Sequence, residues 1–334
     1  MSDPTRPDDA HAGRQARAEA AATDAAVPGA PGSVEALATR VPTELPPGEA
    51  GTSLGREAVR RVVRDPVALF GAFLVVGFVL VAIFAPLIAP YGPNDRVGAV
   101  TPTTIPGPSA EFWFGLDSLG RDEFSRVVYG ARQSLLVGVV SLLMGASVGI
   151  AIGLLAGAFG GWVDALVMRL TDVMLSIPGL LLAIGIAAVL GRSLFSVMVA
   201  IAVVNVPIFI RLLRGSMLAQ RNSDYVVAVR SLGVRDRNVV MGHVLPNSLS
   251  PVIVQGTLTL ATAIIDAAGL AFLGLSGENP AIPEWGRMLA ETQRFLASAP
   301  HLAFFPGAAI VLAALGFTLL GESMREALDP KYRR

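Results

Sequence analysis

The side chains that could carry covalent or metal chemistry are few in this sequence and lie far apart. Cysteine is absent, which excludes disulfides, thiolate metal sites and cysteine nucleophiles. The three histidines, His11, His243 and His301, are too scattered to indicate a metal cluster. The only lysine is Lys331, near the C-terminus, whereas a Walker-type phosphate loop needs a lysine after its glycines. The chain therefore has no P-loop ATPase site of its own.

One glycine–serine–glycine stretch invites comparison with an intramembrane serine protease. It is Gly274-Leu275-Ser276-Gly277, and His301 follows it. We expect the serine at the outer end of one apolar segment and the histidine before the next, so nothing supports a serine–histidine pair. The stretch therefore does not predict a serine protease.

The most patterned polar stretch is DYVVAVRSLGVRDRNVVMGHVLPN, Asp224 to Asn247. It predicts a helix over 225–232, a turn at Gly233, a second helix, and a stop at Leu245-Pro246. Such a stretch suits docking of a soluble partner, and an ordinary amphipathic loop is the alternative. The expected apolar anchor is Tyr225, Val226 and Val229, and the expected polar rim is Asp224, Arg230 and Arg235.

The composition of the chain indicates that the segments on either side of this stretch cross a membrane. The chain is 53% hydrophobic and 16% charged, whereas soluble domains carry about 25% charged residues. The apolar residues gather in long runs, which predict an all-α polytopic fold. Six spans are expected, at about 67–89, 134–157, 167–190, 194–213, 250–275 and 302–320. Six spans place both termini on one side, and the arginine distribution favours the cytoplasm.

The predicted spans divide the chain into four parts. Residues 1–55 are rich in Ala, Pro, Gly and acidic residues and are expected to be a disordered tail. Residues 56–131 are expected to form a basic surface segment, the first span and an extracytoplasmic loop, in which Asp122 caps a short amphipathic helix on the outer surface. Residues 132–322 form a five-helix core that includes the 224–247 loop, and 323–334 form a cytoplasmic tail.

Small and polar residues within the spans carry further expectations. Glycines at every fourth position, Gly145 to Gly157, predict a smooth stripe for close helix packing, and Pro178 is expected to bend the third span. Four polar groups in the spans could line a pathway or pack helices: Asp266, Asn205, Asp172 and Arg169. A carboxylate such as Asp266 costs at least ~2.5 kcal/mol at membrane depth, so it should face a cavity or a partner. Asp172 and Arg169 lie one turn apart and can pair.

Several motifs resemble one known family. LGRD with SRVVYGARQSLLVG, IRLLRG, FLGL with PEWGRML, and LGESMREALDP extend over roughly 64–331. Together they resemble the integral-membrane subunits of binding-protein-dependent ABC importers, and within these the second permease of the dipeptide, oligopeptide and nickel group. Asp224–Asn247 resembles the family's coupling loop. Ala228, Gly233, Leu245 and Pro246 match it, whereas Val227 replaces the usual glutamate and Val229 an alanine.

The resemblance implies a type I ABC importer permease in the cell membrane. Its implied partners are a second permease subunit, two ATP-binding subunits, an extracytoplasmic solute-binding protein and membrane lipid, with no nucleic acid. ATP would bind to the partners, so no cofactor and no catalytic residue is expected in this chain. The implied coupling residues are Asp224, Tyr225, Ala228, Arg230, Gly233, His243, Leu245 and Pro246. The alternative is a secondary transporter, which would show an internal repeat with broken helices; the substrate is left open among dipeptides, oligopeptides, nickel chelates and glutathione.

Overall fold

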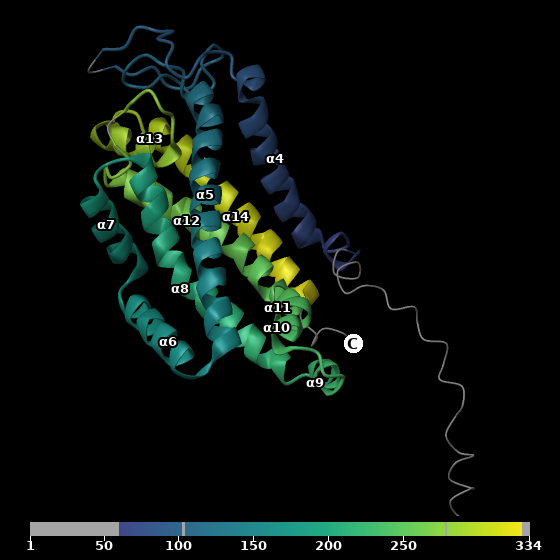
Figure 1. Ribbon diagram of the computed structural model, residues 1–334. Helices are drawn as coiled ribbons and strands as arrows, with labels where there is room; N and C mark the ends of the chain where they lie inside the picture. Colours follow the sequence, from purple (N-terminus) through teal and green to yellow (C-terminus); the bar gives the residue numbers. More distant parts are fainter. Residues whose placement is uncertain (1–59, 102–103, 278, 329–334) are drawn as a thin grey trace, which may run out of the picture. The chain divides into compact units, whose positions relative to one another are not determined.

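The chain folds into long helices joined by polar connections (Figure 1). The computed structural model describes residues 60–101, 104–277 and 279–328, so the predicted tail at 1–55 lies outside the described residues. Of the predicted tail at 323–334, residues 323–328 belong to the last helix and 329–334 lie outside the described residues. Within the described residues, five helices are long and apolar enough to cross a membrane: α4 (Pro66–Ile88), α5 (Glu123–Phe159), α8 (Leu194–Arg221), α12 (Ser250–Phe272) and α14 (His301–Leu328). A sixth span exists if the bent pair α6 (Gly161–Ser176) and α7 (Gly179–Leu190) counts as one.

The start of α4 and the end of α14 meet through a side-chain contact. Asp65 caps α4 by accepting a hydrogen bond from the Val67 amide at 3.0 Å, and Pro66 takes the first helical position. Ser323 of α14 donates its hydroxyl to the same carboxylate at 2.7 Å. These hydrogen bonds, the one from Ser323 first, lower the pKa of Asp65. The first and last spans therefore begin and end at the same end of the bundle, as an even number of spans requires.

Helix α5 differs from the expected short surface helix followed by a separate span. Asp122 does act as the cap, accepting from the Ser125 amide at 2.8 Å, but the helix then continues unbroken for 37 residues. At about 1.5 Å per residue it measures ~55 Å, more than the hydrocarbon core of about 30 Å. Gly130 lies inside the helix and makes room for Trp285: a Cβ at Gly130 would lie 2.7 Å from Trp285 Cδ1.

The predicted glycine stripe packs α5 against α8. A Cβ at Gly145 would lie 2.7 Å from the Ala202 carbonyl oxygen, and one at Gly149 would lie 2.6 Å from Phe209 Cβ. Gly153 and Gly157 continue the stripe against the later turns of α8. Such approaches bring two backbones into contact, and this close van der Waals packing is one of the forces that associate helices within a membrane.

The third expected span is broken rather than bent. Helix α6 ends at Ser176, Ile177 is extended at φ −90° and ψ 130°, and α7 begins at Gly179 with its axis turned by 93°. Pro178 is the cause, since a proline disfavours helical backbone in the residue before it. The position of the bend is confirmed, and its size exceeds a proline kink within one helix.

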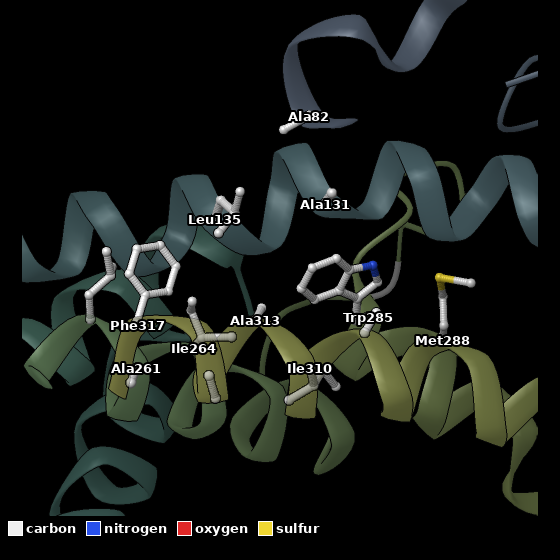
Figure 2. Close-up of a cluster of buried hydrophobic side chains, with 13 residues drawn as sticks. Ala82, Ala131, Leu135, Ala261, Ile264, Trp285, Met288, Ile310, Ala313 and Phe317 are labelled. Carbon is white, nitrogen blue, oxygen red and sulfur yellow. The ribbon is translucent and has the colours of Figure 1, made fainter. Parts of the chain in front are cut away.

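A cluster of buried apolar side chains joins α5, α12 and α14 to α13 (Trp285–Thr292), as Figure 2 shows. Trp285 is 1% exposed, meets the ring of Phe78 edge-on at 5.6 Å, and donates its indole N–H to the Val127 carbonyl at 2.9 Å. A buried indole needs such a partner. The cluster fixes α13 and the loop before it onto the first turns of α5.

Candidate functional site

The loop between α8 and α12, residues 222–249, is a compact helical unit at one end of the bundle, with α13 at the other (Figure 1). It consists of α9 (Asp224–Ser231), a turn, α10 (Asp236–Val239), a π-helical turn (Val240–Val244) and α11 (Leu245–Ser248). Gly233 forms the turn with φ +78°, a conformation that L side chains rarely adopt. A Cβ there would meet nothing within 4 Å, so the requirement for glycine comes from the backbone alone.

The expected stop at Leu245-Pro246 is wrong. The chain stays helical through both residues, and α12 begins at Ser250. The π-helical turn ends at Val244, and Pro246 then falls in the first turn of α11, where its missing N–H costs no hydrogen bond within that helix. The loop is therefore connected to α12 through helical turns.

The expected apolar anchor is partly wrong. Val226 is fully buried in the chain's own core, beside Leu213 and Met217 of α8, and Val229 packs against the same cluster. Helical periodicity in a short segment shows which residues share a face but does not show which partner covers that face. The apolar side chains that remain uncovered on the loop are Tyr225, Val227 (53% exposed), Leu232 (81% exposed) and Met241 (50% exposed).

Polar contacts hold the loop in one shape. The Tyr225 hydroxyl donates to Gln220 Oε1 at 2.8 Å and accepts from Asn247 Nδ2 at 3.2 Å, which ties α9 to α8 and α11. Arg230 and Asp236 form an ion pair at 3.4 Å across the Gly233 turn. The other coupling residues named from sequence lie on the same unit: Asp224, Ala228 and Pro246 are exposed, and His243 and Leu245 are half-buried.

The polar residues within the spans behave differently from one another. Asp172 accepts from Arg211 of α8 at 2.6 Å, so its partner is not Arg169, its neighbour on α6. Asn205 is buried and donates to the Ile201 carbonyl of its own helix at 2.9 Å. Asp266 is half-buried on α12 without a hydrogen bond or ion pair to the described parts of the chain, and its role stays a prediction.

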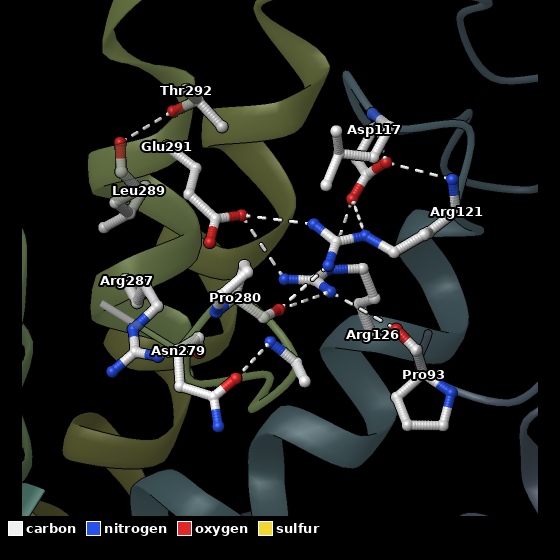
Figure 3. Close-up of polar contacts among 12 residues, drawn as sticks. Pro93, Asp117, Arg121, Arg126, Asn279, Pro280, Arg287, Leu289, Glu291 and Thr292 are labelled. Carbon is white, nitrogen blue, oxygen red and sulfur yellow. Dashed lines mark hydrogen bonds and ion pairs between the residues drawn. The ribbon is translucent and has the colours of Figure 1, made fainter. Parts of the chain in front are cut away.

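A buried ionic network at the α13 end was not expected from sequence (Figure 3). Arg121 and Arg126 both reach Glu291 Oε2, at 3.4 and 3.3 Å, and both donate to the Pro280 carbonyl. Asp117 Oδ2 lies 2.5 Å from Arg121 Nε and 3.5 Å from Arg126 Nε. The start of α5 is thereby clamped to α13 across more than 150 residues of sequence.

Burial raises the pKa of carboxyl groups around this network. It raises the pKa of Glu291, an effect that Arg126 and Arg121 partly offset, and it raises the pKa of Glu284 to about 7. Arg287 donates to the Ser276 carbonyl at 2.8 Å and to its hydroxyl at 3.2 Å. The serine of the glycine–serine–glycine stretch is thus held by an arginine. Among the described residues, no group of three His, Cys, Asp or Glu could hold a metal.

Removing the Glu291 carboxylate is expected to destabilise the α13 end. Glu291→Ala leaves Arg121 and Arg126, 4% and 1% exposed, with Asp117 as their remaining carboxylate partner. Severing a fully buried ion pair costs about 3–5 kcal/mol. We expect a smaller loss, because Asp117 remains and the Glu291 side chain is 32% exposed. Thermal unfolding of the purified protein, followed by tryptophan fluorescence, measures the loss. Glu322→Ala is the control, since its pair with Arg325 is exposed at 3.9 Å; equal shifts in Tm for both variants would contradict the prediction.

Comparison with known proteins agrees with this geometry. The family described as "Binding-protein-dependent transport system inner membrane component" matches residues 149–334, and the "N-terminal TM domain of oligopeptide transport permease C" matches residues 53–102. A dipeptide transport system permease protein, DppC, of Alkalihalophilus pseudofirmus is 43% identical over 304 residues, 89% of this chain and 97% of that protein. A glutathione transport system permease protein, GsiD, of Escherichia coli is 44% identical over 274 residues, 82% of this chain and 89% of that protein.

The fold has a solved counterpart. The inward-facing MetNI methionine ABC transporter includes a chain that superposes with a TM-score of 0.50 at 19% identity, covering 62% of this chain and 97% of that one. The helices thus define a multi-pass membrane protein with the type I importer permease fold. The chain belongs to the binding-protein-dependent transport system inner membrane components. It is a permease of the inner membrane within the peptide and nickel group of ABC transporters.

Proposed function

We propose that the chain is one permease subunit of an ATP-driven importer for short peptides or similar small solutes, and that it forms half of the pathway across the membrane. Family membership supports the importer. The names of the relatives, a dipeptide permease and a glutathione permease, support peptide-like substrates. The other half of the pathway comes from a second permease subunit, and a solute-binding protein delivers the substrate from outside.

The loop 222–249 is the proposed contact with two cytoplasmic ATP-binding subunits. The observation that carries this role is the contrast between its two faces: Val226 is buried in the core of the bundle, while Leu232 and Met241 stay uncovered. A rigid helical loop with uncovered apolar side chains fits a groove on a soluble partner. ATP binds to and is hydrolysed by those partners, so this chain supplies no catalytic residue. His243, Leu245 and Pro246 lie in the part of the loop that leads into α12.

Reconstitution tests the proposal. The chain is co-purified with its second permease, ATPases and binding protein, placed in liposomes, and supplied with a radiolabelled dipeptide or glutathione. We expect uptake that requires ATP, the ATPases and the binding protein together. Uptake by the permeases alone, driven by an ion gradient, would instead establish the secondary transporter. The ligand that co-purifies with the binding protein identifies the substrate.

A further inference from the structure

Apolar packing holds α6 weakly. Of its 16 residues only Thr171 is buried. Large apolar side chains on it are instead uncovered in the chain: Trp162, Leu166, Leu170 and Val173. Its continuation α7 turns away by 93°, so α6 does not share the packing of a straight span. Other contacts must keep α6 in place against the bundle.

Two ion pairs to α8 supply those contacts. Arg214 binds Asp164 through both ends of its guanidinium, Nε to Oδ1 at 2.8 Å and Nη2 to Oδ2 at 2.5 Å. Arg211, one turn earlier on α8, binds Asp172 at 2.6 Å. The bidentate pair is the better shielded, with side chains 29% and 19% exposed. Planar two-point pairing fixes direction as well as distance, so Arg214 sets how α6 lies on α8.

The same helix α8 holds the loop and the end of α5. Arg221 donates to the Gly157 carbonyl at 3.0 Å, in the last turn of α5. Ser223 follows it and turns the chain into α9 by bonding the Gln220 carbonyl. Val226 of α9 is buried against Leu213 and Met217 of α8. A displacement of the loop must therefore move the end of α8 that carries Arg211 and Arg214.

We propose that Arg211 and Arg214 are positioning residues that make the broken span α6–α7 follow the loop 222–249 during transport, through Asp172 and Asp164. This rests on the proposed function. The pairs give the loop a direct mechanical connection to the span that is broken between α6 and α7. A helix held by two ionic contacts and little apolar packing can move as a unit with the helix that bears their partners.

Neutralising one partner tests the connection in the reconstituted complex. Asp164→Asn is expected to lower ATP-driven uptake about tenfold or more, since truncating one partner of a hydrogen-bonded charge pair is costly. ATP hydrolysis by the partner subunits is expected to continue, so the solute moved per ATP falls. The exchanged pair Asp164→Arg with Arg214→Asp should restore much of that ratio. Glu322→Gln, in an exposed pair, is the control and should change neither quantity.

A distance measurement separates this proposal from the proposed function. The chain lacks cysteine, so spin labels can be placed at Trp162→Cys on α6 and Ala219→Cys on α8, both exposed. We expect one narrow distance, the same without nucleotide and with ATP trapped, and a broad distribution once Asp164→Asn is added. An α6–α8 distance that changes between the two states overturns the proposal, as does unchanged uptake per ATP in Asp164→Asn or an equal loss of hydrolysis and uptake. Absence of ATP-driven uptake in the unaltered complex contradicts the proposed function instead, and the spin-label distance still decides the connection.

Discussion

The substitution Gly149→Leu is expected to prevent α5 from packing on α8. An added Cβ at Gly149 would already lie 2.6 Å from Phe209 Cβ and 2.8 Å from the Val206 carbonyl oxygen. Both atoms belong to or sit directly on the α8 backbone, so no side-chain rotation relieves the clash. Overpacking typically costs about 1–3 kcal/mol where side chains can adjust, and here the whole helix must shift. We expect the variant to lose its folded, monodisperse form.

Fluorescence-detected size exclusion and thermal unfolding in detergent measure this effect. Gly77→Leu on α4 is a matched control, because a Cβ at that helical glycine meets nothing within 4 Å. The control should elute and unfold like the parent protein. A Gly149→Leu protein with the parent's elution profile and Tm would show that the two helices do not depend on their close approach.

The glycine stripe could be predicted because helix packing by small residues leaves a period of four in the sequence. The break at Pro178 could be placed for the same kind of reason, since proline acts on the residue just before it. The angle of 93° could not be predicted, because it depends on how α7 packs against α8. The two helices approach closely there, since a Cβ at Gly179 would be 3.1 Å from Val204 of α8. Local rules locate such a break, and tertiary contacts set its direction.

Ion pairs between residues far apart in the sequence could not be predicted from short-range spacing. Arg169 and Asp172 are one turn apart, so sequence favoured their pairing, yet Arg211 of α8 takes Asp172. The arginines at the start of α5 were visible, but Glu291 as their shared partner was not. Val226 was expected to contact a partner, but it is buried in the chain's own core. The sequence could not distinguish the two, since an apolar face on a short helix fits either. The loop's helix–turn–helix form was confirmed, because Gly233 is a local signal.

The substitution Gly233→Pro is expected to abolish ATP-driven uptake while leaving the membrane spans inserted. The native φ is +78°, whereas the proline ring holds φ near −65°. The Gly233 amide also donates to the Arg230 carbonyl at 2.9 Å, a hydrogen bond that proline cannot make. The turn must open, and the Arg230–Asp236 pair across it is then lost with the orientation of α9 relative to α10. The change lies outside the helices that are apolar enough to span the membrane, so insertion should persist.

Two companion variants isolate the cause of that loss. Gly233→Asn should keep most uptake, since asparagine tolerates the left-handed conformation better than other side chains. Val227→Glu should also be tolerated, because Val227 is 53% exposed and a glutamate is usual in the loops that this one resembles. ATP-driven uptake and retention of the ATP-binding subunits during purification are measured for all three. If the Gly233→Pro protein transports fully, the loop does not couple ATP hydrolysis to the membrane helices. If only the proline variant fails, the geometry of this one turn carries that coupling.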